Sequence, residues 1–330
     1  MFKKNIFPIL SGTLALLFTI YIALDTFVIS HAYVTVPSSK SSISSVVSSS
    51  GTSATISNAA LDESSSNTQS TSSSAPMLTE NSYGDDNIQI AISSYRENNT
   101  DIYVADIVLS SPEYLKTALA KSTYGKNVVD TTSNIADDNN AILAINGDYY
   151  GVQESGYVIR SGVLYRSTSR GDQEDLAIYE DGSMAIINEQ DITAEELLQS
   201  GVYNLLCFGP GLLDAGQITV STNDEVDKAM ASNPRTAIGM IDDLHYVFVV
   251  ADGRTSESEG LSLYELAQFM QSLDVQTAYN LDGGGSSTMY FNGQLVNNPT
   301  SGSGHKSGHY GNTSSSGSER SVSDIVYIGY

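Results

Sequence analysis

Short apolar runs recur along the chain after about residue 80, and they predict a domain built largely of strands. The apolar and β-branched runs lie at 141–145, 244–250 and 275–281, with strand character resuming at 287–291. Asp181-Gly182 and Asn292-Gly293 separate strand-like runs, so each pair predicts a hairpin turn.

Helices are fewer. Ser262 and Glu265 form a capping-box pattern ahead of apolar residues at helical spacing, and Thr193 with Glu196 forms a second one. A third helix is expected from Ser111 to Lys121, because Pro112 suits a first helical position. The sequence therefore predicts an α+β fold, a single domain with a mixed β-sheet and a few helices.

The N-terminus carries an export or anchoring signal. Lys3 and Lys4 precede an uncharged run at 5–24, long enough at about 1.5 Å per residue to cross a hydrocarbon core of about 30 Å. This length favours a single-pass membrane anchor with the C-terminal part extracytoplasmic, because signal-peptide cores are about 7–15 residues long. Cleavage after Ala32, giving a secreted protein, is the alternative.

A serine- and threonine-rich stretch at 36–74 has too few large apolar groups to offset the entropy cost of ordering. It predicts a disordered spacer. The expected organisation is an anchor or signal at 1–32, a linker at 33–80 and a folded domain at 81–330.

The net charge and the cysteine content exclude one class of partner and one kind of cross-link. The formal net charge of -23 argues against nucleic acid as a partner, because a polyanion needs a basic footprint. Cys207 is the only cysteine, so no disulfide can form within the chain, and its apolar neighbours indicate a buried structural thiol.

The stretch from Asn280 to Tyr290 holds the strongest candidate for chemistry. Asp282 is followed by Gly283, Gly284 and Gly285 and then by Ser286, between two predicted strands. Successive glycines allow another molecule to approach the main chain, and their amides can form an anion-binding nest. A tight hairpin turn is the alternative explanation.

Asp252 follows another predicted strand and is itself followed by Gly253. One helix separates this strand end from that of Asp282, an arrangement that can bring both carboxylates to one sheet edge. Paired carboxylates suit acid/base chemistry. Either aspartate alone would also fit an ordinary Asp-Gly turn.

Six separated motifs resemble the phosphodiester glycosidase family over roughly residues 140–330. The motifs are Ala144–Tyr150, Pro234–Gly239, Val250–Arg254, Ser258–Gly260, Asn280–Ser286 and Glu319–Val322. The resemblance implies a hydrolase that cleaves a sugar-1-phosphodiester, with a phosphate-linked glycan as its partner. Cell-surface glycans or exopolysaccharides are the expected substrates, and nothing in the chain selects among them.

The resemblance also implies site residues. Asp282 is expected as nucleophile or general base, with Asp252 and Glu259 as candidates for the other carboxylate. Arginine forks suit phosphate, although any of them could instead form a structural ion pair. The substrate-binding set is Asn146, Asp148, Arg235, Arg254, Gly283, Gly284, Gly285, Ser286 and Arg320.

No cofactor and no metal site are expected. His305 and His309 lie in a polar segment at 299–318, read as a lid or a plain loop, and no third zinc ligand accompanies them. A calcium-dependent domain is disfavoured because no Asp-x-Asp-x-Asp-Gly loop occurs.

A non-catalytic module that binds envelope glycans is the alternative function. Nothing in the sequence selects an oligomeric state.

Overall fold

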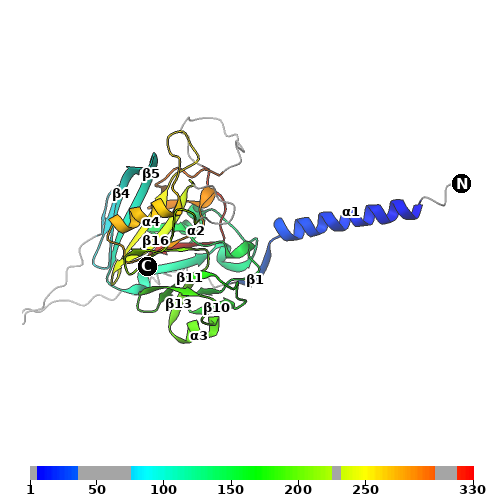
Figure 1. Cartoon of the computed structure of the whole chain (residues 1–330), viewed down its shortest axis with the longest axis horizontal. Helices are drawn as coiled ribbons and strands as arrows, with labels where there is room; N and C mark the ends of the chain where they lie inside the picture. Colours follow the sequence, from blue (N-terminus) through cyan, green and yellow to red (C-terminus); the bar gives the residue numbers. More distant parts are fainter. Residues whose placement is uncertain (1–5, 36–75, 225–231, 302–317) are drawn as a thin grey trace, which may run out of the picture.

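The computed structural model describes residues 6–35, 76–224, 232–301 and 318–330. In this part of the chain, strands are packed into a body from which helix α1 (Ile6–Phe27) projects (Figure 1). The other helices are α2 (Thr132–Asp138), α3 (Ala194–Gln199) and α4 (Leu263–Ser272), with 3-10 turns η1 (Pro112–Tyr114), η2 (Ala120–Ser122), η3 (Tyr150–Val152) and η4 (Gly284–Ser286).

The longest sheet has nine strands, and all of its paired neighbours run antiparallel. Its order is β15 (Gln217–Ile218), β14 (Gly211–Asp214), β18 (Thr277–Asn280), β16 (Arg235–Asp242), β17 (His245–Ala251), β5 (Thr100–Leu109), β4 (Ile88–Glu97), β3 (Ser82–Gly84) and β2 (Met77–Leu78).

Two five-stranded sheets complete the body, and a short β1–β7 pair lies beside them. The β8 sheet has the order β20 (Gln294–Leu295), β19 (Met289–Phe291), β8 (Leu143–Asn146), β21 (Asp324–Ile328) and β6 (Leu115–Leu119). The β11 sheet has the order β10 (Val163–Arg166), β9 (Val158–Arg160), β13 (Val202–Leu206), β11 (Glu174–Tyr179) and β12 (Met184–Asn188). The pair is β1 (His31–Thr35) with β7 (Thr123–Lys126).

The main core lies where the three larger sheets meet. Ile145 of β8, Leu176 of β11 and Phe248 of β17 belong to one buried cluster. The opposite face of the nine-stranded sheet packs against α4, where Val247 and Leu266 share a second cluster. Strand β17 is thus buried on both faces, which explains its nearly continuous apolar sequence.

The expected α+β class is confirmed in its coarse form, as a mostly β domain with few helices. The strands are divided among several sheets, and their named pairs run antiparallel. Both predicted capping boxes are present, at Thr193 with Glu196 and at Ser262 with Glu265.

The helix predicted from Ser111 to Lys121 was wrong. Ser111 and Pro112 do start a helical turn, but it ends at Tyr114 and the chain continues as strand β6. Strand β6 pairs with β21 along its whole length, so long-range pairing prevails over the local start signal.

Within the described residues, no helix is long and apolar enough to cross a membrane. The expected membrane anchor is therefore not supported by the structure. Strand β1 contains residues 33–35 of the predicted linker and strand β2 contains residues 77–78, whereas residues 36–75 lie outside the described part.

Candidate active site

Strands β17 and β18 both end at the same edge of the nine-stranded sheet, and β16 begins there between them. Arg235 pairs with Ala251 in this register, so Asp252 is the first residue beyond β17. Asp282 follows β18 by two residues. With neighbouring strands about 4.8 Å apart, β17 and β18 are separated by about 10 Å. The predicted arrangement of the two aspartates at one edge is therefore present.

The glycine turn connects two different sheets, because β18 belongs to the nine-stranded sheet and β19 to the β8 sheet. It is not a hairpin. Gly284 has a φ of +63°, a region that glycine enters without strain. The amides of Gly284, Ser286 and Ser287 donate to carbonyls of the protein, so much of the expected anion nest is already used internally.

Asp282, Ser286 and Arg320 form a connected group. The Ser286 hydroxyl donates to Asp282 Oδ2 at 2.6 Å, and Arg320 Nη2 donates to Oδ2 and Oδ1 at 2.8 and 3.1 Å. Arg320 Nε also donates to Ser286 Oγ at 2.8 Å. The Arg320 side chain remains 43% exposed while that of Asp282 is 9% exposed, so the arginine can reach both the acid and a bound anion.

Burial raises the pKa of Asp282, and the positive charge of Arg320 together with the Ser286 hydrogen bond opposes that rise. The net effect is a pKa above the ordinary aspartate value. A more basic carboxylate that is still held by a guanidinium suits the role of general base.

Asp252 is also buried, and it is held by the segment after β20. Asn297 Nδ2 donates to its Oδ1 at 2.9 Å, and Asn298 N donates to both oxygens at 3.1 and 3.2 Å. Burial raises the pKa of Asp252 despite these bonds. Beside it, burial and the Asp252 charge raise the pKa of Tyr103 to about 12, so the phenol stays protonated.

Arg254 lies against the glycine turn. A Cβ on Gly284 would come 2.9 Å from Arg254 Nη2, and the same nitrogen donates to Asn233 Oδ1 at 2.9 Å. Arg235, in contrast, is buried, and its Nε donates to the Leu261 carbonyl at 2.9 Å. Arg254 and Arg320 therefore flank the turn as partly accessible cations, whereas Arg235 braces the loop before α4.

Asn146 lies in the site but is engaged by the protein. Its amide nitrogen donates to the Asp282 carbonyl at 2.6 Å, and its amide oxygen accepts from Thr236 Oγ1 and from Thr288 N. These bonds tie β8, β16 and the glycine turn together. In this structure Asn146 positions the turn, and its predicted contact with substrate stays a prediction.

Asp148 belongs to a buried network next to the site. Its Oδ2 accepts from Arg160 Nη2 at 2.7 Å and from Cys207 N at 2.9 Å. Arg160 also pairs with Asp324 at 2.7 Å. Asp148 is 1% exposed, so its geometry favours a structural function over sugar binding.

Glu259 is exposed, and its contacts within the described residues come from its backbone: its N–H donates to Asn99 O, and its carbonyl accepts from Arg254 N.

Asn297 is a site residue that sequence reasoning missed. Its signal was weak, since the Asn297-Asn298 pair looks like ordinary turn composition.

A cavity of about 630 Å³ lies elsewhere, and its lining includes neither Asp252 nor Asp282. Tyr165, Tyr203 and Tyr327 are among its walls. The candidate site is thus defined by its polar cluster at the sheet edge. Of the predicted lid only residues 299–301 and 318 are described, and both of its histidines lie outside the described residues.

The profile of the phosphodiester glycosidase family matches residues 139–328, more than half of the chain. This chain belongs to the phosphodiester glycosidase family. The resemblance seen in the six motifs is confirmed, and the match includes Asp252, Asp282 and Arg320.

Curated relatives extend the phosphodiester glycosidase match. The chain is 29% identical over 186 residues to human N-acetylglucosamine-1-phosphodiester alpha-N-acetylglucosaminidase, covering 52% of this chain and 35% of that protein. It is 26% identical over 270 residues to the uncharacterized SPbeta prophage-derived protein YomE of Bacillus subtilis, covering 74% of this chain and 39% of YomE. The chain thus spans well under half the length of these relatives.

Two solved structures share the fold. The zebrafish N-acetylglucosamine-1-phosphodiester alpha-N-acetylglucosaminidase catalytic domain, auto-inhibited by its pro-peptide, aligns with a TM-score of 0.56 at 23% identity, covering 74% of this chain and 83% of that chain. A hypothetical protein from Synechocystis aligns with a TM-score of 0.54 at 15% identity, covering 74% and 62%. At these identities the similarity is evidence for the fold of the phosphodiester glycosidases.

Proposed function

We propose that this chain is a hydrolase that cleaves the bond between the anomeric carbon of a sugar and a phosphodiester oxygen. The observation that carries the proposal is the Asp282–Ser286–Arg320 group on a glycine turn at the sheet edge. It combines a buried carboxylate with an accessible cation, the two charges that a phosphate-linked sugar requires. The family supports the same reaction class.

In the proposed reaction, water replaces the phosphate at the anomeric carbon. The carbon–oxygen bond to phosphate breaks, a phosphate monoester leaves, and one proton of the water is released. Asp282 serves as nucleophile or general base, and Asp252 supplies the second carboxylate. Because a phosphate monoester leaves readily, electrostatic stabilisation by Arg254 and Arg320 does more than general-acid help.

The substrate class is also a proposal. The human, mouse and bovine relatives are named for N-acetylglucosamine-1-phosphodiesters, so an N-acetylhexosamine linked to phosphate is the first substrate to test. Phosphate-linked glycans of the cell envelope or exopolysaccharides fit the extracytoplasmic location, which rests on the N-terminal sequence alone. Detection of the catalytic part outside the cytoplasm by cell fractionation would test that location.

The reaction class is tested with a panel of sugar-1-phosphodiesters, using the purified full chain and its Asp282→Asn variant. Asp181→Asn is the matched control, since Asp181 is an exposed acid in the β11–β12 turn. Free sugar released by the parent and the control, with a loss on the order of 10²-fold or more in Asp282→Asn, is expected. Equal turnover by Asp282→Asn would contradict the carboxylate mechanism.

A non-catalytic glycan-binding module is the alternative. It would bind the panel members without releasing sugar, and Asp282→Asn would leave that binding unchanged. Measuring sugar binding on the same two proteins separates the two functions.

A further inference from the structure

A second polar cluster is buried in the β11 sheet, outside the candidate active site. Asp175 lies near the start of β11, Glu189 directly follows β12, and Cys207 directly follows β13. Strand β11 lies between β12 and β13 and is antiparallel to both, so its start meets their ends. The sheet therefore brings together three side chains that are far apart in the sequence.

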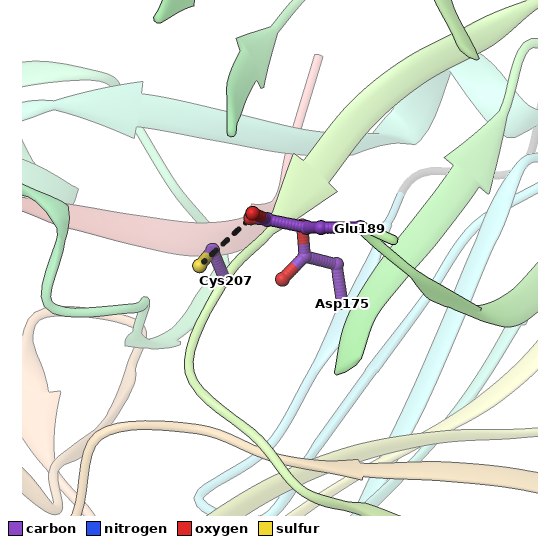
Figure 2. A group of neighbouring side chains, drawn as sticks. All are labelled: Asp175, Glu189 and Cys207. Atoms are coloured by element: carbon purple, nitrogen blue, oxygen red, sulfur yellow. Dashed lines mark hydrogen bonds between the residues drawn. The ribbon is translucent and has the colours of Figure 1, made fainter. Parts of the chain in front are cut away.

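The three side chains converge on one point (Figure 2). One ligand atom from each lies within 4.8 Å of the others, and the Cys207 thiol donates a hydrogen bond to Glu189 Oε1 at 3.7 Å, a proton that zinc would replace. Zinc–sulfur and zinc–oxygen bonds of about 2.3 and 2.1 Å at a tetrahedral angle place the two ligand atoms about 3.6 Å apart. The observed separation fits that geometry.

Asp175 is the independent observation that points to a ligand. Its side chain is completely buried, and its carboxylate faces Glu189 and Cys207 without a well-formed hydrogen bond from either oxygen to any described residue. An unpartnered buried carboxylate costs several kcal/mol unless a proton or a cation compensates it. One of its oxygens lies within 4.8 Å of a ligand atom of each of the other two residues.

Two arginines lie near the cluster, and Arg160, which reaches it through Asp148, is already engaged. The Arg160 guanidinium pairs with Asp148 and Asp324, each at 2.7 Å. Backbone amides of Tyr157 and Arg170 hold Glu189, which fixes its carboxylate toward the cluster as second-sphere donors do at metal sites.

Space beside the sulfur is kept by a glycine. Gly156 has a φ of +98°, and a Cβ there would come 2.5 Å from Cys207 Sγ and 3.6 Å from Glu189 Oε1. Arg166 Nη2 lies 3.7 Å from the position of that added Cβ, and it has no hydrogen-bond partner among the described residues. Arg166 and a shared proton are therefore the competing source of compensating charge.

We propose that Asp175, Glu189 and Cys207 bind one zinc ion that cross-links three strands of the β11 sheet. A thiolate excludes magnesium and calcium as preferred ions, whereas zinc accepts sulfur and carboxylate oxygen together. Because Cys207 N donates to Asp148, the ion also helps to hold the loop that follows Asn146 of the candidate active site. The site is structural, and its occupancy does not depend on the proposed hydrolase activity.

The test is elemental analysis of the untagged full chain after incubation with zinc chloride and desalting. The parent and the Asp181→Asn control are expected to retain about one zinc per chain, and Cys207→Ser and Asp175→Asn to lose most of it. Chelation should lower the thermal midpoint of the parent, and added zinc should restore it. His305→Ala with His309→Ala should keep the zinc, since the proposed ligands are Asp175, Glu189 and Cys207.

X-ray absorption on the zinc-loaded parent keeps the test independent of variant folding. One sulfur ligand at about 2.3 Å is expected. Absence of retained zinc in the parent, a spectrum without sulfur, or equal zinc in Cys207→Ser would overturn the proposal and leave Arg166 and a shared proton as the compensating charges.

Discussion

The guanidinium of Arg320 donates to both carboxylate oxygens of Asp282, at 2.8 and 3.1 Å. A backbone hydrogen bond also joins the two segments, because Arg320 N donates to the Gly285 carbonyl at 3.1 Å. The charge on Asp282 and the position of the glycine turn are therefore coupled to one arginine, and changing Arg320 should alter both.

The pH profile of kcat/KM should report Asp282. Its pKa is raised by burial, so the ionised form is lost at a higher pH than for an ordinary aspartate, and the acid limb should lie above about pH 4. In Arg320→Gln the opposing positive charge is removed, so the pKa of Asp282 should rise further and the limb should move to higher pH. A limb that moves to lower pH would contradict this assignment.

Asp252 and Glu259 compete for the second carboxylate role, and their surroundings differ. Asp252 is buried and held by Asn297 and Asn298, whereas Glu259 is exposed. Asp252→Asn should lower kcat on the order of 10²-fold, and Glu259→Gln by less than about threefold. Parallel steady-state kinetics of the two variants measure this, and the reverse order would assign the role to Glu259.

Gly284→Ala should reduce both stability and activity. Its φ of +63° costs a side-chain residue about 1 kcal/mol, and the new Cβ would displace Arg254. Gly293→Ala is the matched control, because Gly293 also has a positive φ but a Cβ added there would have no neighbour within 4 Å. Similar losses of unfolding free energy, with reduced kcat/KM only in Gly284→Ala, are expected; equal kcat/KM in both would show that Arg254 tolerates the shift.

Asn297→Ala should act through Asp252. Asn297 donates to Asp252 Oδ1 and to the Ser287 carbonyl, so its loss leaves the carboxylate less stabilised in its charged form. The pKa of Asp252 should rise further, since this bond opposes the effect of burial. The corresponding limb of the pH–rate profile should move to higher pH. An unchanged profile with lower thermal stability would show that Asn297 only supports the fold.

Local patterns predicted much of the domain. The two capping boxes, the strand β17 and the turns at Asp181-Gly182 and Asn292-Gly293 depend on residues close in sequence, and all are present. Strand β6 was missed because its pairing with β21 is long-range. The local hydrophobic pattern also could not predict how the strands divide among separate sheets, because that division depends on packing between distant segments.

For the site, motif spacing selected Asp282, Arg320 and Asp252 as candidates, but it did not give the partners of each side chain. The sequence could not reveal that Asn146 and Asp148 are used by buried protein contacts, because those partners come from distant strands. It also gave Cys207 a purely apolar setting, since Asp175 and Glu189 reach it only through the register of the β11 sheet.

The most direct test of the central claim is hydrolysis of an N-acetylglucosamine-1-phosphodiester by the full chain in ¹⁸O-labelled water, followed by mass spectrometry of both products. Cleavage at the anomeric carbon predicts the label in the free sugar and unlabelled phosphate monoester, with no product from Asp282→Asn above the uncatalysed rate. Label in the phosphate would show attack at phosphorus and contradict the glycosidase assignment.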